Sequence, residues 1–128
     1  KAERMPKSQQ NVFGEPIELC CNDPVTGFYR DGHCNTGPND LGTHTVCALM
    51  TSTFLEYSAS AGNDLSTPRP EYGFPGLVEG NRWCLCALRW EQAHRAGKAP
   101  KLYLRATNIV TLRAIPLEVL KPYALDLV

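Results

Sequence analysis

The sequence lacks the features that mark membrane proteins and nucleic-acid-binding proteins. Its 128 residues contain no run of 18 apolar residues, so no membrane-spanning helix is expected. Its 13 basic residues cancel its 13 acidic ones, which leaves no overall field to attract nucleic acid or an anionic membrane. The first ten residues lack the apolar core of a signal peptide. We therefore predict a cytoplasmic protein that binds neither nucleic acid nor a membrane, and the sequence leaves its oligomeric state open.

Chain length and composition predict one domain. A chain of 128 residues has the commonest domain size, and its 43% hydrophobic residues are enough to bury roughly two thirds of the unfolded surface. Residues 1–10 are polar and show no periodicity, so we expect a disordered N-terminal extension. The single globular domain is predicted to span residues 11–126.

Turn residues divide this domain into short segments of both structural types. A strand is expected over Thr43–Met50, followed by a helix that Thr51 or Thr53 caps, and Arg82–Trp90 is apolar enough to suggest a strand in the centre of a sheet. The rest is expected to form a short helix over Trp90–Ala96, a strand over Leu102–Ala106, and helical segments over Thr107–Ala114 and Pro116–Leu125. The predicted class is α+β, with a small mixed or antiparallel sheet, helices packed on it and long loops.

The six cysteines are predicted to be reduced, because the sequence shows no export signal and the domain is large enough to fold without disulfides. Each then has three possible roles: a small buried apolar group, a metal ligand or a reactive nucleophile. They are Cys20, Cys21, Cys34, Cys47, Cys84 and Cys86.

One hypothesis is a metal site that uses two close pairs of ligands, with zinc or iron as the candidate ion. The pairs are His44 with Cys47 and Cys84 with Cys86. On a strand, Cys84 and Cys86 point to the same face, whereas His44 and Cys47 point to opposite faces. Only a bulge or a helical turn at Thr45-Val46 would let all four bind one ion. The alternative is that these cysteines are buried as small apolar residues.

A second hypothesis is nucleophilic catalysis in the loop that precedes the first strand. The loop and its end contain a cysteine, two histidines and two acids: Asp31, His33, Cys34, Asp40 and His44. A histidine can take the proton of a thiol while a carboxylate orients the imidazole, so we single out Asp31, Cys34 and His44 as candidate catalytic residues. Alternatively, these polar residues form turns and caps.

The long loop between Gly62 and Asn81 gives a third group of candidates. Arg69 and Arg82 are candidate ligands for a carboxylate or phosphate, with Tyr72 and Phe74 as apolar walls. The alternative is that the arginines pair with nearby acids and fix the loop. The leading hypothesis is a small-molecule-binding or catalytic pocket formed by the loops 20–44 and 63–80. The alternatives are a Cys/His metal-binding domain and a protein-interaction module without chemistry.

Four motifs carry a resemblance to a known family. In order, they are DPVTGFYRDGHCNTGPND, GTHTVCALMTSTFLEYS, GNDLSTPRPEYGFPGL and NRWCLCALRWEQA. Together they resemble the mainly bacterial family catalogued as domain of unknown function 2237, over about Asn11 to Tyr123. The resemblance implies a domain extent and a set of motifs, and it implies no reaction.

Overall fold

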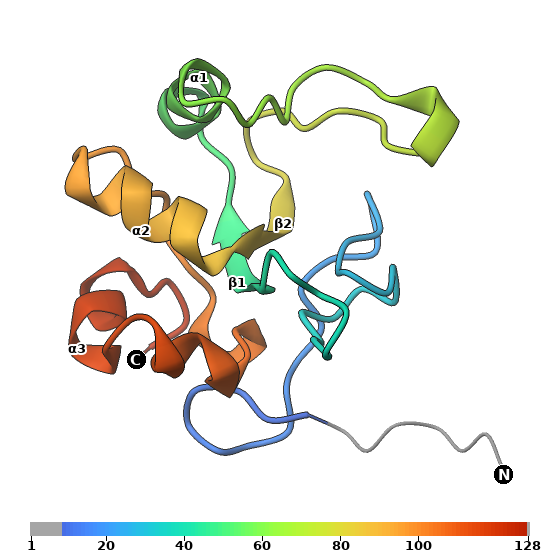
Figure 1. The fold of residues 1–128 in the computed structure, drawn as a ribbon. Coiled ribbons are helices and arrows are strands. Elements are labelled where there is room, and N and C mark those ends of the chain that lie inside the picture. Colours follow the sequence, from blue (N-terminus) through green and yellow to red (C-terminus); the bar gives the residue numbers. More distant parts are fainter. Residues whose placement is uncertain (1–8, 128) are drawn as a thin grey trace, which may run out of the picture.

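The computed structural model describes residues 9–127, which fold around a two-stranded antiparallel sheet (Figure 1). The strands are β1 (His44–Leu49) and β2 (Arg82–Cys86), and Cys47 lies opposite Cys84 in their register. Three α-helices and several short 3₁₀ turns surround the sheet. The α+β class and the single domain with helices packed on a small sheet are therefore confirmed.

The helix that follows β1 is capped at Thr51, one of the two capping positions that the sequence predicts. Helix α1 spans Ser52–Ser60, and its N-cap is Thr51, whose hydroxyl accepts the N–H of Phe54 at 3.0 Å. That hydrogen bond satisfies one of the free N–H groups of the first turn. The chain leaves the helix at Gly62, whose φ of 98° is a left-handed conformation that glycine adopts without strain.

The prediction of a central strand over Arg82–Trp90 is wrong in two respects. The strand ends at Cys86, and helix α2 (Ala87–Arg95) follows it directly. Strand β2 is also one of only two strands in its sheet. Its apolar character has another cause: Trp83 and Leu85 belong to the main core, whereas Cys84 belongs to a separate buried group of cysteines. Because both faces are covered, an edge strand can be as apolar as a central one.

The C-terminal third contains less regular structure than expected. Leu102 makes isolated bridges to Ala48 and Ala124, and a 3₁₀ turn follows at Leu104–Ala106, so the predicted strand over Leu102–Ala106 is wrong. Another 3₁₀ segment covers Ile109–Arg113, and helix α3 is limited to Leu117–Leu120. Further 3₁₀ turns lie at Pro70–Tyr72 and Lys121–Tyr123. Between these short pieces, the N–H groups of Tyr103 and Asn108 donate to the carbonyls of Cys47 and Thr45 in β1, each at 2.9 Å.

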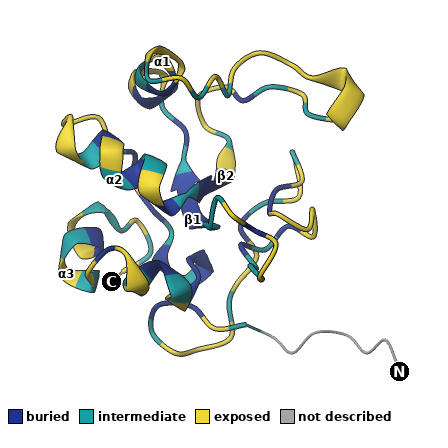
Figure 2. Cartoon of the chain, in the orientation of Figure 1, coloured by how far each residue is buried: buried dark blue, intermediate teal, exposed yellow. Residues whose placement is uncertain are grey.

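The main core lies between the sheet and the helices, where the buried residues gather in Figure 2. Its largest fully buried side chains include Trp90, Phe54 and Met50. Trp90 also donates its indole N–H to the carbonyl of Pro100 at 3.0 Å, so its polar atom is satisfied. This core fixes β1, α1 and α2 relative to one another and gives the loops a rigid support.

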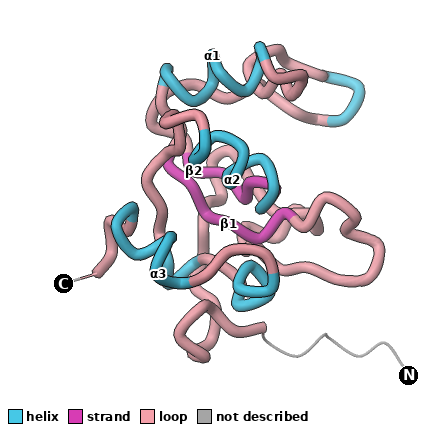
Figure 3. Tube along the Cα trace, turned by 60° about the vertical axis from the view of Figure 1, so that its left-hand side comes forward, coloured by secondary structure: helices cyan, strands magenta, loops and turns pink. Residues whose placement is uncertain are grey.

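Loops make up most of the chain (Figure 3). Residues 1–8 of the predicted N-terminal extension lie outside the described residues. Gln9 and Gln10 are described: the Gln9 side chain bonds to Thr36 and Asn108, and Gln10 forms a bridge with Pro16. Within residues 9–127, none of the helices has the length and apolar character needed to cross a membrane.

Candidate functional site

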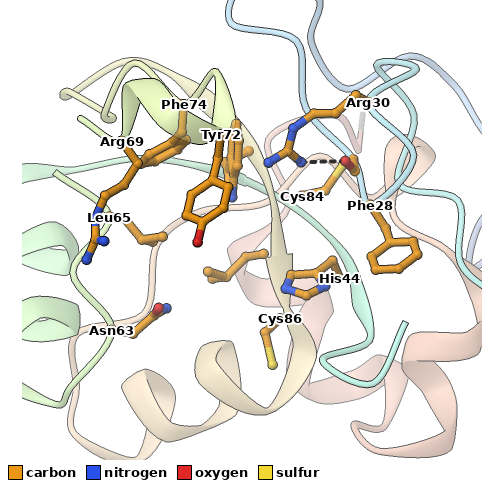
Figure 4. A pocket seen from close by; sticks show the side chains of 13 residues that line it. Phe28, Arg30, His44, Asn63, Leu65, Arg69, Tyr72, Phe74, Cys84 and Cys86 are labelled. Atoms are coloured by element: carbon orange, nitrogen blue, oxygen red, sulfur yellow. Dashed lines mark hydrogen bonds between the residues drawn. The ribbon is translucent and has the colours of Figure 1, made fainter. Parts of the chain in front are cut away.

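A pocket of about 420 Å³ lies beside β2, between the two long loops. Figure 4 shows Phe28 and Arg30 from the first loop on one side, and Asn63, Arg69, Tyr72 and Phe74 from the second loop on the other. His44 and Cys86, from the paired ends of the two strands, lie at the lower end. The lining residues are Gly27, Phe28, Arg30, His44, Asn63, Leu65, Arg69, Tyr72, Phe74, Trp83, Cys84, Leu85 and Cys86.

The walls of the pocket are largely aromatic. Phe74 packs edge-on against Trp83 with ring centroids 5.4 Å apart, and this contact attaches the second loop to β2. Phe28 stacks on the imidazole of His44 at 6.3 Å, with an angle of 16° between the rings. Flat aromatic walls suit a ligand that has a planar or apolar part.

The charged side chains that line the pocket are arginines. Arg30 donates from Nη1 to the carbonyl of Gly27 at 2.6 Å, and its guanidinium lies 5.2 Å from the centroid of the Trp83 ring. Arg69 has a loose, exposed ion pair with Glu71 at 3.9 Å. Among the described residues, no Asp or Glu lines this pocket. The pocket therefore attracts negative charge.

His44 is held by a buried carboxylate. The Nδ1 atom of His44 lies 2.6 Å from Oδ1 of Asp40, whose side chain is fully buried. Oδ2 of Asp40 accepts the His44 backbone N–H and the Thr36 hydroxyl, each at 2.9 Å. Burial by itself would raise the pKa of Asp40, but these hydrogen bonds outweigh it and hold the pKa below the usual value. Asp40 is therefore an anion at neutral pH.

An anionic Asp40 fixes the tautomer of His44. A carboxylate can only accept hydrogen bonds, so Nδ1 of the neutral imidazole carries the proton and Nε2 keeps its lone pair. Gly42 is required for this arrangement, because a Cβ at that position would collide with Cε1 of the imidazole. Thr43 has a φ of 51°, a strained value for a β-branched residue, and it directly precedes His44. The local backbone thus sets the position of the ring.

Cys86 is a close neighbour of His44, although the two residues are 42 positions apart. They are Cα partners in the ladder, and the N–H of Ala87 donates to the carbonyl of Thr43 at 3.0 Å. That bond joins the residues next to His44 and Cys86, so His44 and Cys86 themselves are a non-hydrogen-bonded pair. In such a pair the Cα atoms are about 4.5 Å apart and the side chains are close together. Cys86 is a free, partly exposed cysteine. In the view of Figure 4 its sulfur is turned away from the ring.

The other buried cysteines form two disulfides. Cys20 is bonded to Cys47, and Cys34 is bonded to Cys84. The prediction of reduced thiols is therefore wrong for these four residues, and only Cys21 and Cys86 are free. Sequence separation hid the pairs, because the fold brings together sulfurs that are 27 and 50 residues apart. All four lie in one buried group, and the sulfurs of Cys20, Cys34 and Cys47 are within 4.8 Å of one another.

These positions correct the metal hypothesis that combined His44 with Cys47, Cys84 and Cys86. A register shift between His44 and Val46 does supply the bulge that this hypothesis required. However, Cys47 and Cys84 are taken up by disulfides, and Nδ1 of His44 is taken up by Asp40. Cys47 and Cys84 therefore belong to the buried sulfur group, of which Cys84 also lines the pocket, whereas His44 and Cys86 lie at the end of the pocket.

Six of the predicted site residues line the pocket: His44, Arg69, Tyr72, Phe74, Cys84 and Cys86. Three other candidates, Cys34, Asp31 and Arg82, lie outside it.

Cys34 is fully buried in a disulfide, so it cannot act as a nucleophile in this state. Asp31 is exposed and accepts hydrogen bonds from the His33 backbone and the Asn35 side chain, as a turn residue does. Arg82 places its guanidinium 3.9 Å from the centroid of the Tyr103 ring and does not line the pocket.

Sequence reasoning missed Arg30 and gave Cys86 a different role. Arg30 lies in a turn-rich stretch, DPVTGFYRDG, where a basic residue gives no signal of its own. Cys86 was considered only as a metal ligand, because pairing between residues 44 and 86 cannot be read from either segment alone. Asp40, and not Asp31, is the carboxylate that orients His44. The spacing of four residues between Asp40 and His44 was the available signal.

Comparison with known proteins supports a single family. A family model described as "Uncharacterized protein conserved in bacteria (DUF2237)" matches residues 10–124, which is most of the chain. No curated protein matches the sequence.

Proposed function

Because the chain belongs to the DUF2237 family, whose description specifies no activity, we propose a function from the pocket itself: it binds a small anionic molecule with an aromatic or apolar part. The observation that carries the proposal is the composition of the lining. Two arginines and a histidine line the pocket together with four aromatic side chains, and the described lining residues include no acid.

The size of the pocket is consistent with this proposal. A volume of about 420 Å³ lies within the usual range for small-molecule sites, roughly 300 to 1,000 Å³. Arg30 and Arg69 come from different loops and lie on opposite sides of the pocket in Figure 4, so each offers a separate contact to a carboxylate or phosphate. The rings of Phe74 and Trp83 would cover the apolar part of the same ligand.

Binding of benzoate, with neutral benzamide as the reference, tests the proposal. Benzoate is expected to bind in calorimetry and to raise the unfolding midpoint, and benzamide is expected to bind at least tenfold more weakly, because it lacks the charge. Arg69→Ala should weaken benzoate binding by roughly 10- to 100-fold, the usual worth of a hydrogen bond to a charged group. Arg82→Ala is the matched control, since this exposed arginine lies over Tyr103 outside the pocket. Equal effects of the two variants would contradict the proposal.

A second candidate function is supported by the buried sulfur group. If the disulfides are reduced, Cys20, Cys34 and Cys47 offer three thiolates within 4.8 Å of one another, and Cys84 is available as a fourth. Four thiolates are a preferred ligand set for structural zinc. Elemental analysis of protein purified under reducing conditions tests this candidate. One equivalent of zinc or iron that disappears in Cys47→Ser would support it, and metal-free protein with a native fold would reject it.

Cytoplasmic location remains a prediction. The two disulfides count against it, because such bonds persist mainly in oxidising compartments. Titration of thiols in protein taken directly from cells, with the thiols trapped in acid, would test it. Two reactive thiols per chain would indicate an oxidised protein, and six would indicate a reduced one.

A further inference from the structure

We propose that Cys86 is the nucleophile of a thiol-dependent acyl-transfer site, with His44 as its general base and Asp40 as a positioning residue. This inference rests on the anionic-ligand pocket proposed above and assigns a reaction to it. Three observations meet at one place: a free cysteine, a histidine whose tautomer is fixed, and the cavity that both of them line.

The first step of the argument is the pairing of the two residues. His44 and Cys86 form a non-hydrogen-bonded pair, so their side chains leave the same face of the ladder close together. No hydrogen bond joins the Cys86 sulfur to the imidazole among the described contacts, and Figure 4 shows the sulfur turned from the ring. Rotation about the Cα–Cβ bond of a partly exposed cysteine is fast, and the proposal requires the rotamer in which the sulfur meets Nε2. Catalytic contacts of this kind often form only when substrate binds.

The second step is the state of His44. The carboxylate of Asp40 holds the proton on Nδ1, so Nε2 is the atom that can accept the thiol proton. Gly42 and the strained Thr43 keep the ring in place, and Phe28 covers one of its faces. A cysteine, a histidine and an orienting acid in this order of contact are the components of nucleophilic catalysis.

The third step is the backbone around the sulfur. In a non-hydrogen-bonded pair the backbone groups of both residues point away from the partner strand, so the N–H of Cys86 faces the free edge of β2. The N–H of Cys84 points to the same edge and donates to the hydroxyl of Thr26 at 2.8 Å. Because the N–H of Cys86 faces away from β1, it is a candidate donor to an oxyanion. The side chain of Cys86 makes no capping bond to helix α2, which begins at the next residue.

The reaction balances without any redox partner. The thiol proton passes to Nε2 of His44, and the sulfur attacks the carbonyl carbon of an ester or thioester. A C–S bond forms, the bond to the leaving alcohol or thiol breaks, and the protonated His44 gives its proton to the leaving oxygen or sulfur. Water then attacks the acyl group and gives a proton to Nε2 of His44. The C–S bond breaks, a carboxylic acid is released, and His44 returns the proton to the sulfur. Arg30 and Arg69 select acyl groups that carry a negative charge.

Acylation by two aryl esters tests this inference on the whole chain. Mono(4-nitrophenyl) terephthalate carries a carboxylate that cannot reach its own ester, and 4-nitrophenyl benzoate is its neutral counterpart. The anionic ester is expected to release about one equivalent of nitrophenolate per chain in a burst and to react at least tenfold faster than the neutral ester. Mass spectrometry should locate the 4-carboxybenzoyl group on Cys86.

Variants separate the roles of the residues. Cys21→Ser, which changes the other free cysteine, should leave the burst intact, whereas Cys86→Ser should remove it. His44→Gln should slow acylation by about 100-fold or more, as expected for loss of a general base. Asp40→Asn should slow acylation while the affinity for benzoate stays within twofold, since a positioning residue affects the rate and leaves the binding. Acylation of Cys21 and Cys86 by the anionic ester at equal rates would overturn the inference.

Alkylation by chloroacetamide tests the reactivity of Cys86 in the unsubstituted protein. This reagent is neutral, so its reaction does not depend on the arginines. Native protein should react at Cys86 at least tenfold faster than at Cys21, and urea should remove the difference.

If benzoate binds as proposed but Cys86 shows neither preferential alkylation nor acylation, the catalytic inference fails and the proposed function stands. If Cys86 reacts preferentially but the two esters react equally and benzoate does not bind, the proposed function fails and this inference loses its anionic substrate.

Discussion

At the scale of single residues, two strained backbone positions adjoin the pocket. Arg30 has a φ of 55° and Thr43 a φ of 51°, in a region that residues with a side chain rarely adopt. Such a conformation costs on the order of 1 to 3 kcal/mol and persists only where the surroundings impose it. In both cases the strained residue sets a functional group: the Arg30 guanidinium beside Trp83, and the imidazole of the following His44.

Replacement of Arg30 should weaken ligand binding without lowering the stability of the fold. Arg30→Gly is expected to keep or slightly raise the unfolding midpoint, because glycine adopts this φ without strain. The same change should weaken benzoate binding by roughly tenfold or more, because one guanidinium is lost. Thermal unfolding and calorimetry on one preparation measure both effects. Loss of stability without loss of affinity would show that Arg30 has a structural role only.

The acid sensitivity of the protein should depend in part on Asp40. Its pKa is lower in the folded protein than in the unfolded chain, so its contribution to stability is complete above the unfolded value of about 3.9 and is lost as the pH falls through the folded value. Asp40→Asn should therefore be less stable than the parent at pH 7, by about 1 to 3 kcal/mol, and this difference should shrink below about pH 4. Urea unfolding from pH 7 to pH 2.5 measures it. A difference that is constant with pH would contradict the assignment.

At the scale of elements, β2 organises the site because each of its faces has a different neighbour. Trp83 and Leu85 enter the main core, Cys84 joins the buried sulfur group, and Cys86 ends the strand at the pocket. Helix α2 starts at Ala87 and packs against both strands, which holds this end of β2 in position. The pocket loops are therefore attached to the sheet beside the main core.

Adjacent substitutions in β2 should have very different effects on folding. Trp83→Ala is expected to lower the free energy of unfolding by about 3 to 5 kcal/mol, because a nearly fully buried ring is removed from the core. Arg82→Ala should cost no more than about 1 kcal/mol, since it loses only an exposed cation–π contact with Tyr103. Denaturant unfolding of the two variants gives the comparison. A larger cost for Arg82→Ala would mean that the two faces of the strand are wrongly assigned.

At the scale of the whole molecule, the two disulfides attach the loop that precedes β1 to the sheet. Cys20 is bonded to Cys47 of β1, and Cys34 is bonded to Cys84 of β2. The loop carries Phe28 and Arg30, so one wall of the pocket is fixed covalently between these two anchors. The second loop has no such bond among the described residues and depends on the packing of Phe74 against Trp83.

Reduction should therefore destabilise the molecule and loosen one wall of the pocket. Chain-entropy arguments give about 3 to 4 kcal/mol for closing loops of this length, for each disulfide. We expect a lower midpoint of urea unfolding with reductant than without it. Weaker benzoate binding under reducing conditions is expected as well. The double variant Cys20→Ala, Cys47→Ala isolates the first disulfide. An increase in stability on reduction with added zinc would instead favour the metal-binding candidate.

The sequence by itself determined the α+β class, strand β1, the N-cap of α1 and the two loops that form the pocket. These features depend on local properties: β-branched and apolar runs, a capping threonine, and the density of glycine and proline. It also indicated His44, Arg69, Tyr72 and Phe74, because functional side chains in long loops are recognisable by type.

Only the tertiary structure decided which groups meet. The pairing of residue 44 with residue 86, the choice of Asp40 over Asp31, and the joining of Cys34 to Cys84 all depend on contacts between distant segments. Neither the loop nor the strand contains information about the other, so a sequence can offer several cysteines and acids without showing which of them share a site. Packing of the core makes that selection, because it fixes the register of two strands and places one loop over each side of their shared end.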